Sequence, residues 1–223
     1  MFLYLHGFAS GPHSYKARRF VHHLAERGLS AEVPALDEGD FEHLTLTRQL
    51  RLIERTLAAA PRPHVLVGSS MGGYLALLHA SHHPVDALVV MAPAVDFAAR
   101  WLARVSPEER AQWERTDCLW VDHHAQQRKA ALSYDLARDA SLHAPWPRVT
   151  APTLVAHGRR DTVVPLGPVK QWVERTPSAQ LLTYDSDHEL TDVADVIFAE
   201  AFRFLAKVPA VVEAHGALRL GQL

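Results

Sequence analysis

The sequence contains a single cysteine, Cys118, so the chain cannot form an internal disulfide. Nothing therefore points to an oxidising compartment, and the fold must depend on packing. Cys118 lies in a tryptophan-rich stretch and in no catalytic motif. We interpret it as a packed or partly exposed thiol.

Long hydrophobic runs and a strong excess of one charge are also missing. No apolar run approaches the ~20 residues that span a bilayer, so we expect no stable membrane insertion. The formal net charge of −2 gives no electrostatic reason to bind nucleic acid. The N-terminal apolar stretch has no basic leader, so it predicts a strand and not a signal peptide. We therefore expect a cytoplasmic protein.

Short apolar runs alternate with longer amphipathic segments along most of the chain. The expected strands are 2–5, 31–33, 65–67, 87–91, 153–156 and 180–184. The expected helices are 14–27, 44–60, 70–82, 169–175 and 193–205. This alternation predicts a three-layer α/β fold, with a mostly parallel sheet of about six strands and helices on both faces. The length of 223 residues suits a single domain spanning residues 1–223.

One stretch, residues 95–148, is too long for a simple connection between two strands. Its hydrophobic spacing is mostly helical, and it holds four of the five tryptophans. A long insertion of this kind is typical of a lid over a site, so we expect a helical lid or cap. The alternative is a group of helices packed against one sheet edge. Trp101 and Trp113 are candidate substrate contacts, although a tryptophan more often packs in a core.

The last residues, 208–223, have no clear place in the sheet. They fit either a docked tail or a loose end. We found no internal repeat that would change the assignment of the single domain.

The sequence Gly68-Ser69-Ser70-Met71-Gly72 fits G-x-S-x-G, with Ser70 at its centre. This motif places a nucleophilic serine on a sharp turn between a strand and a helix. An apolar strand comes directly before it, and a helical pattern follows. Ser69 is the competing nucleophile, but it lacks the symmetric flanking glycines. We therefore predict Ser70 as the nucleophile.

A serine hydroxyl needs a base to remove its proton, and the base needs a third group to orient it. Asp161 follows one expected strand and His188 follows the last one, in the order serine, acid, histidine. The carboxyl ends of parallel strands meet at one edge of a sheet, where sites form. Asp185 and Asp187 are alternative acids, but a sequence neighbour rarely has the geometry to hold the ring. We predict Ser70, Asp161 and His188 as the triad.

Two backbone N–H groups should stabilise the negative charge that develops on the substrate. Met71, directly after the nucleophile, and Phe8, in the loop after the first strand, are the predicted oxyanion-hole residues. We expect His6 to brace that loop and not to act on substrate. Several of the 15 histidines occur as adjacent pairs that face different directions on a helix. They lack the i, i+4 spacing of a helical metal site, so we predict no catalytic metal. Catalysis by a serine, a histidine and an acid needs no cofactor, so we predict none.

Four segments in this order make the chain similar to the α/β-hydrolase superfamily over nearly its whole length. They are Leu5-His6-Gly7-Phe8, Gly68-Ser69-Ser70-Met71-Gly72-Gly73, His157-Gly158-Arg159-Arg160-Asp161-Thr162-Val163-Val164-Pro165 and Asp187-His188. The segment from Tyr4 to Ala17, YLHGFASGPHSYKA, resembles the opening of small bacterial esterases of the YqiA type and of mammalian mitochondrial ABHD-type thioesterases. The resemblance implies hydrolysis of carboxylic esters or thioesters beneath a modest cap.

The expected reaction is a two-step acyl transfer to water through an acyl-enzyme on Ser70. The expected partner is a small-molecule acyl ester or thioester; the oligomeric state is left open. One alternative is other chemistry on the same scaffold, such as C–C hydrolase, perhydrolase or lyase activity. A second is an amidase or peptidase. The third is a non-catalytic binding protein, which would have no need of an activated serine.

Overall fold

A six-stranded parallel sheet forms the centre of the computed structural model, which describes residues 1–216. Its strands are β1 (Phe2–Leu5), β2 (Ala31–Glu32), β3 (Val65–Ser69), β4 (Ala87–Met91), β7 (Thr153–Gly158) and β8 (Ala179–Tyr184). They are ordered β2-β1-β3-β4-β7-β8, and every neighbouring pair is parallel. The predicted strands match these bounds to within two residues.

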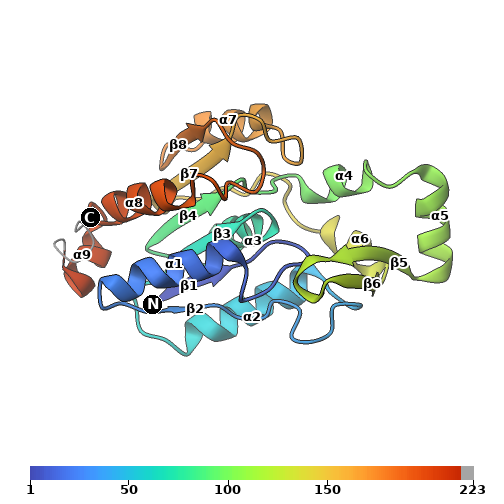
Figure 1. Cartoon of the computed structure of the whole chain (residues 1–223), viewed down its shortest axis with the longest axis horizontal. Coiled ribbons are helices and arrows are strands. Elements are labelled where there is room, and N and C mark those ends of the chain that lie inside the picture. The colour runs from blue at the N-terminus through green and yellow to red at the C-terminus, as the bar shows by residue number, and fades with distance from the viewer. Residues whose placement is uncertain (217–223) are drawn as a thin grey trace.

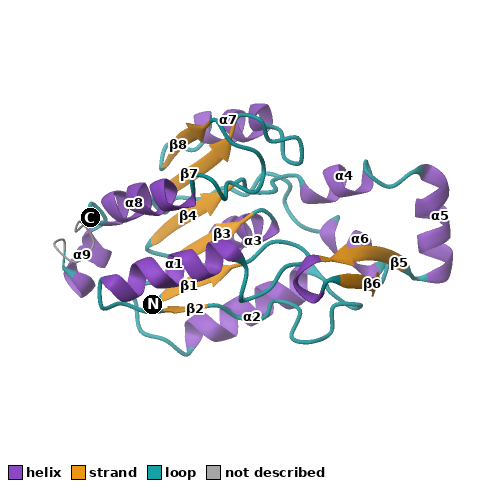
Figure 2. Ribbon diagram, viewed as in Figure 1, coloured by secondary structure: helices purple, strands orange, loops and turns teal. Residues whose placement is uncertain are grey.

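Helices cover both faces of this sheet, as Figures 1 and 2 show. They are α1 (Tyr15–Glu26), α2 (Leu46–Ala58), α3 (Met71–His82), α7 (Leu166–Glu174) and α8 (Ala194–Leu205). Successive residues of a strand face opposite sides of the sheet. Phe2 and Tyr4 accordingly pack in the cluster with α1 and α8, whereas Leu3 and Leu5 pack with α2 and α3. The predicted α/β fold is confirmed.

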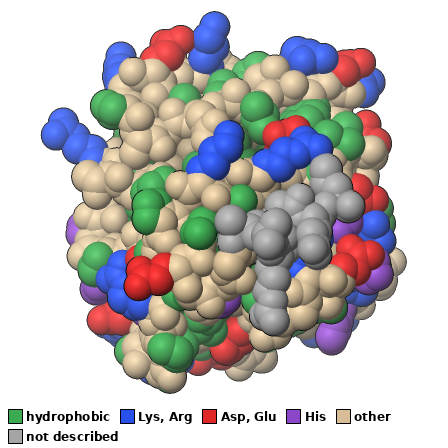
Figure 3. Space-filling model, turned by 90° about the vertical axis from the view of Figure 1, so that its left-hand side faces the viewer, with side chains coloured by type: hydrophobic (Ala, Val, Ile, Leu, Met, Phe, Trp, Pro, Cys, Tyr) green, Lys and Arg blue, Asp and Glu red, His purple; other side chains and the backbone are tan. Residues whose placement is uncertain are grey.

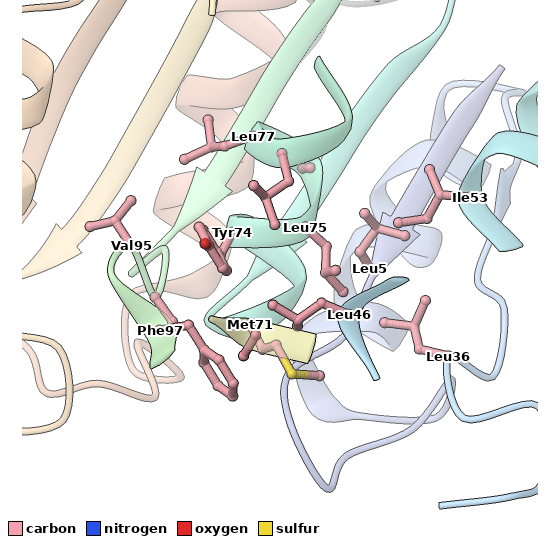
Figure 4. Packing of buried hydrophobic residues seen from close by; sticks show 14 of the residues in the cluster. Leu5, Leu36, Leu46, Ile53, Met71, Tyr74, Leu75, Leu77, Val95 and Phe97 are labelled. Carbon is pink, nitrogen blue, oxygen red and sulfur yellow. The ribbon is translucent and has the colours of Figure 1, made fainter. Parts of the chain in front are cut away.

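Helix α3, which begins directly after Ser70, is buried in the core. Every residue from Met71 to His79 is buried, so this helix has no solvent face over most of its length. Figure 4 shows Leu75 of α3 beside Leu5 of β1, while Tyr74 of the same helix lies on the side of Phe97. A Cβ atom built on Gly72 would lie 2.1 Å from the carbonyl oxygen of Leu5. Only glycine permits this close approach of helix and strand.

The insertion of residues 95–148 lies beyond the carboxyl ends of the strands (Figure 1). It contains α4 (Phe97–Leu102), α5 (Pro107–Thr116), β5 (Leu119–His123), the 3-10 turn η1 (His124–Gln126), β6 (Arg128–Leu132) and α6 (Asp135–Ala140). The insertion, expected to be a helical lid or cap, is therefore helical only in part. Strands β5 and β6 form an antiparallel hairpin of their own. Trp120 and Asp122 are exposed while their neighbours are more buried, the period-two pattern of a half-covered strand.

The segment after α8 docks onto the sheet as far as it is described. Helix α9 (Pro209–His215) buries Val211, and the His215 ring lies 5.4 Å from that of Phe2. Residues 208–223 were expected to form either a docked tail or a loose end, and residues 208–216 form a docked tail. Residues 217–223 lie outside the described part of the chain.

The face that looks away from the insertion carries interspersed charges of both signs (Figure 3). No helix within residues 1–216 has the length and hydrophobicity to cross a membrane. The cytoplasmic location stays a prediction.

Candidate active site

Ser70 lies in a strained turn between β3 and α3. Its backbone angles are φ 54° and ψ −117°, a region that residues other than glycine rarely adopt. The Ser70 N–H donates to Met91 O on the neighbouring strand at 2.9 Å. The Ser70 carbonyl accepts from Tyr74 N and Ala94 N, both at 3.0 Å. The surrounding backbone therefore holds the strained conformation in place.

The structure brings Ser70, His188 and Asp161 together in one hydrogen-bonded chain. His188 Nε2 lies 3.0 Å from Ser70 Oγ, and His188 Nδ1 lies 2.8 Å from Asp161 Oδ2. The three side chains follow β3, β7 and β8, whose carboxyl ends share one edge of the sheet. The Asp161 side chain is fully buried, while His188 retains 12% exposure. This is the geometry that a serine, a base and an orienting acid require.

Hydrogen bonds keep the Asp161 carboxylate ionised despite its burial. Burial alone would raise its pKa, but the donors around it lower the pKa below the ordinary value. His188 donates to Oδ2, and Oδ1 accepts from the backbone N–H groups of Val163 and Val164, each at 2.8 Å. An ionised carboxylate fixes the tautomer in which Nδ1 carries the proton and Nε2 faces Ser70.

Gly158 lets two loops come together: the acid loop, residues 159–165, which carries Asp161, and the histidine loop, residues 185–193, which carries His188. A Cβ atom on Gly158 would lie 2.4 Å from Asp187 O, which no side chain could tolerate. Next to it, the fully buried His157 donates through Nε2 to Val164 O at 2.8 Å. Burial lowers the pKa of His157 and favours its neutral ring. His157 thus closes the turn that carries Asp161.

The competing residues do not join the hydrogen-bonded chain. Ser69 is the last residue of β3 and is buried, and His188 Nε2 contacts Ser70 Oγ instead. Asp185 is exposed and forms an ion pair with Arg160. Asp187 accepts from Glu189 N and has no contact with the His188 ring among the hydrogen bonds and ion pairs of the described residues. The geometry agrees with the choice of Asp161.

The loop after β1 lies beside Ser70 and lines the same cavity. His6 Nε2 accepts from Leu36 N at 3.2 Å, and its Nδ1 lies 2.9 Å from Gly7 O. His6 therefore links this loop to the chain after β2, which agrees with its predicted bracing role. Phe8 and Met71 both line the cavity above Ser70. Neither of their N–H groups takes part in a backbone hydrogen bond in the turns and loops of residues 1–216.

A cavity of about 630 Å³ opens above Ser70, a size that suits a small-molecule ligand. One wall is aromatic, made by Phe8, Phe97 and Trp101. The Trp101 ring lies 5.7 Å from that of Phe8 and 6.5 Å from that of Phe97. The insertion therefore supplies apolar surface to the site, through α4.

Of the two tryptophans predicted to contact substrate, the structure places only Trp101 at the cavity. The prediction for Trp113 is wrong. Its side chain is fully buried and donates through Nε1 to Leu132 O at 2.7 Å. Its ring packs edge-on against Tyr134, with 4.9 Å between centroids. Trp113 is the core of the insertion itself.

Sequence reasoning missed three cationic side chains that line the cavity. They are Lys16 of α1, Arg100 of α4 and Arg104 just after it. Arg104 donates to Val163 O at 2.8 Å, which ties the insertion to the acid loop. Lys16 lies within the motif that resembles the YqiA-type opening, and it occupies the buried side of an amphipathic helix. A lysine on the apolar face of a predicted helix is the sequence feature that could have marked Lys16 as a candidate site residue.

Within the described residues, no three His, Cys, Asp or Glu side chains come together in a way that could hold a metal ion. The groups at the cavity are suited to proton transfer, nucleophilic attack and stabilisation of negative charge.

Comparison with known proteins relates nearly the whole chain to one family. The family model described as an uncharacterised protein family, UPF0227, matches residues 1–205. Among curated proteins, the bovine mitochondrial palmitoyl-protein thioesterase ABHD10 is 30% identical over 148 residues. That alignment covers 61% of this chain and 48% of the bovine protein. The chain thus spans about half the length of the curated relatives it matches.

Solved structures share the fold across most of the chain. Mouse α/β-hydrolase domain-containing protein 10 aligns with a TM-score of 0.73 and 22% identity, covering 87% of this chain and 84% of the mouse chain. Est1E from Butyrivibrio proteoclasticus, with ferulic acid bound, aligns with a TM-score of 0.73 and 21% identity, covering 92% and 89%. These likenesses confirm the α/β-hydrolase fold.

Proposed function

The chain belongs to the uncharacterised protein family UPF0227, and from that premise and the geometry of the cavity we propose that it is a serine hydrolase of acyl esters or thioesters. The observation that carries the proposal is the chain of contacts from Asp161 through His188 to Ser70. A receptor would gain nothing from a strained serine held against an oriented imidazole.

In this mechanism His188 Nε2 takes the proton of Ser70 as Oγ attacks the carbonyl carbon of the substrate. The N–H groups of Met71 and Phe8 hold the oxyanion, and ionised Asp161 stabilises the imidazolium. The imidazolium then protonates the departing oxygen or sulfur atom as its bond to the carbonyl carbon breaks, so an alcohol or thiol leaves and the acyl group stays on Ser70. His188 next takes a proton from a water molecule that attacks the acyl-enzyme, and it returns this proton to Ser70 Oγ as the carboxylic acid is released.

The aromatic wall of the cavity supports an apolar acyl group as the part of the substrate that is held. Phe8, Phe97 and Trp101 offer contiguous ring surface beside the nucleophile. The relatives' printed name, palmitoyl-protein thioesterase, supports including thioesters beside oxygen esters. Residues 95–148 act in this proposal as the cap that completes the acyl site.

The test is turnover of p-nitrophenyl esters from acetate to palmitate, together with the matching thioesters. The expected result is an optimum in chain length, and a roughly 10⁶-fold lower kcat in Ser70→Ala. Ser69→Ala is the matched control and should keep activity, because Ser69 has no contact with His188 in the described hydrogen bonds. Folded Ser70→Ala with wild-type turnover would overturn the proposal.

A further inference from the structure

Lys16 is an unusual residue to find inside the molecule. It lies in the first turn of α1, and its side chain is only 9% exposed. Lysines are almost never buried without a partner, because removing an ammonium from water is costly. Burial lowers the pKa of Lys16, and the carboxylates of Glu189, Asp187 and Asp161 oppose that shift. This position therefore holds a charge at a cost, beside the candidate triad.

The partner of Lys16 is the loop that carries His188. Lys16 Nζ donates to the backbone carbonyl of Glu189 at 2.5 Å and lies 3.7 Å from Glu189 Oε2. Glu189 directly follows His188, and its own side chain is 68% exposed. The hydrogen bond joins residues that are 173 positions apart in the chain. It is a direct link between α1 and the peptide next to the base.

The same loop is restrained on its other side by the acid loop. Gly158 approaches Asp187 O closely, and Arg160 N donates to Ser186 O at 3.0 Å. The backbone before His188 therefore packs against the loop of Asp161, while the backbone after His188 accepts a hydrogen bond from Lys16. Removing Lys16 would leave the second side of the loop without this restraint.

We propose that Lys16 is a positioning residue, which holds His188 at hydrogen-bonding distance from Ser70 through the carbonyl of Glu189. This inference rests on the proposed function. Lys16 has no hydrogen bond or ion pair to Ser70, His188 or Asp161 among the contacts of residues 1–216, so it acts through the loop. Positioning errors of ~1 Å can cost about 10²-fold in rate.

The test compares Lys16→Met, which keeps the length of the side chain but loses its donors, with Lys16→Arg, which retains them. We expect Lys16→Met to lower kcat by roughly 10- to 100-fold with little change in KM, and Lys16→Arg to restore most of the loss. Labelling of Ser70 by a fluorophosphonate probe should slow by a similar factor, because it also requires the base. Lys170→Met, an exposed lysine on α7, is the matched control and should match wild type.

The possible results separate the two proposals. A wild-type protein that neither turns over esters nor reacts with the probe would contradict the proposed hydrolase. A reactive wild type with equal labelling in Lys16→Met would overturn only the positioning role. A higher KM with unchanged kcat would also overturn it, because Lys16 would then bind substrate directly. If Lys16→Met fails to fold, Lys16→Leu, which also lacks donors, and Lys16→Arg give the same comparison, and failure of Lys16→Arg to exceed Lys16→Leu in kcat contradicts the role.

Discussion

The sheet and the insertion both line the cavity, the sheet through turns at the ends of its strands and the insertion through side chains of a short helix. Strands β3, β7 and β8 end in short turns that fix Ser70, Asp161 and His188 through backbone contacts. The insertion reaches the cavity with side chains of the six-residue helix α4, among them Trp101. The comparison indicates a division of work. In the proposed function, the strand ends set the chemistry and the insertion sets the shape of the acyl site.

The insertion also touches both loops that border the cavity. Arg104 donates to Val163 O in the acid loop, and Ala125 N donates to Ala9 O in the loop after β1, at 3.2 Å. A change in the insertion can therefore reach the site without touching the three candidate catalytic residues. The predictions below separate chemistry at the strand ends from structure and binding in the insertion.

The largest of the three effects that separate the two regions is expected at the strand ends, from Asp161→Asn. This substitution keeps the size of the side chain but removes the charge that fixes the His188 tautomer. We expect kcat to fall by roughly 10⁴-fold with the fold intact. Asp185→Asn makes the same chemical change in an exposed residue and should leave kcat nearly unchanged. Steady-state kinetics of the pair would contradict the division of work if the two variants behaved alike.

The second effect concerns the stability of the insertion. Trp113→Ala removes a fully buried indole and its hydrogen bond to Leu132 O, so we expect a loss of about 3–5 kcal/mol in the free energy of unfolding. Trp120→Ala, in the same insertion but 61% exposed, should cost about 0.5 kcal/mol or less. Denaturant titrations of both variants provide the measurement. A small effect at Trp113 would refute its role as the core of the insertion.

The smallest effect concerns substrate choice. Trp101→Ala should raise KM for long-chain esters roughly 10-fold, equivalent to about 1.4 kcal/mol of lost contact, and leave acetate turnover unchanged. Trp146→Ala is the control, since Trp146 is 39% exposed and does not line the cavity. Kinetics across chain lengths would measure both. An equal loss for acetate and palmitate would show that Trp101 serves the chemistry and not the acyl site.

The same two regions differ in how far the sequence could predict them. Strands 2–5 and 87–91 were predicted at their observed bounds, because buried parallel strands are short apolar runs bounded by glycine or proline. The positions of Ser70, Asp161 and His188 followed from the order of strand ends in such a sheet. Their roles remain proposals that the experiments above address.

The insertion was less predictable for a physical reason. The mostly helical spacing of hydrophobic residues in the insertion concealed the strand pattern of β5 and β6. Each of these strands has only five residues, too few for a clear alternation of buried and exposed side chains. Trp101 and Trp113 look alike in the sequence, because both are aromatic residues on short helices. Only the packing of the helices decides that one faces the cavity and the other is buried behind it. The buried Lys16 was missed because its partner, the carbonyl of Glu189, is distant in the sequence.

The central claim is that Ser70 is a nucleophile activated by His188. The most direct test is to treat the wild-type chain with a fluorophosphonate probe and to locate the adduct by mass spectrometry of its peptides. We expect one adduct per chain on Ser70 in the wild type and in Ser69→Ala, and none in Ser70→Ala. A folded wild-type protein with no adduct, or with its adduct on another residue, would contradict the account.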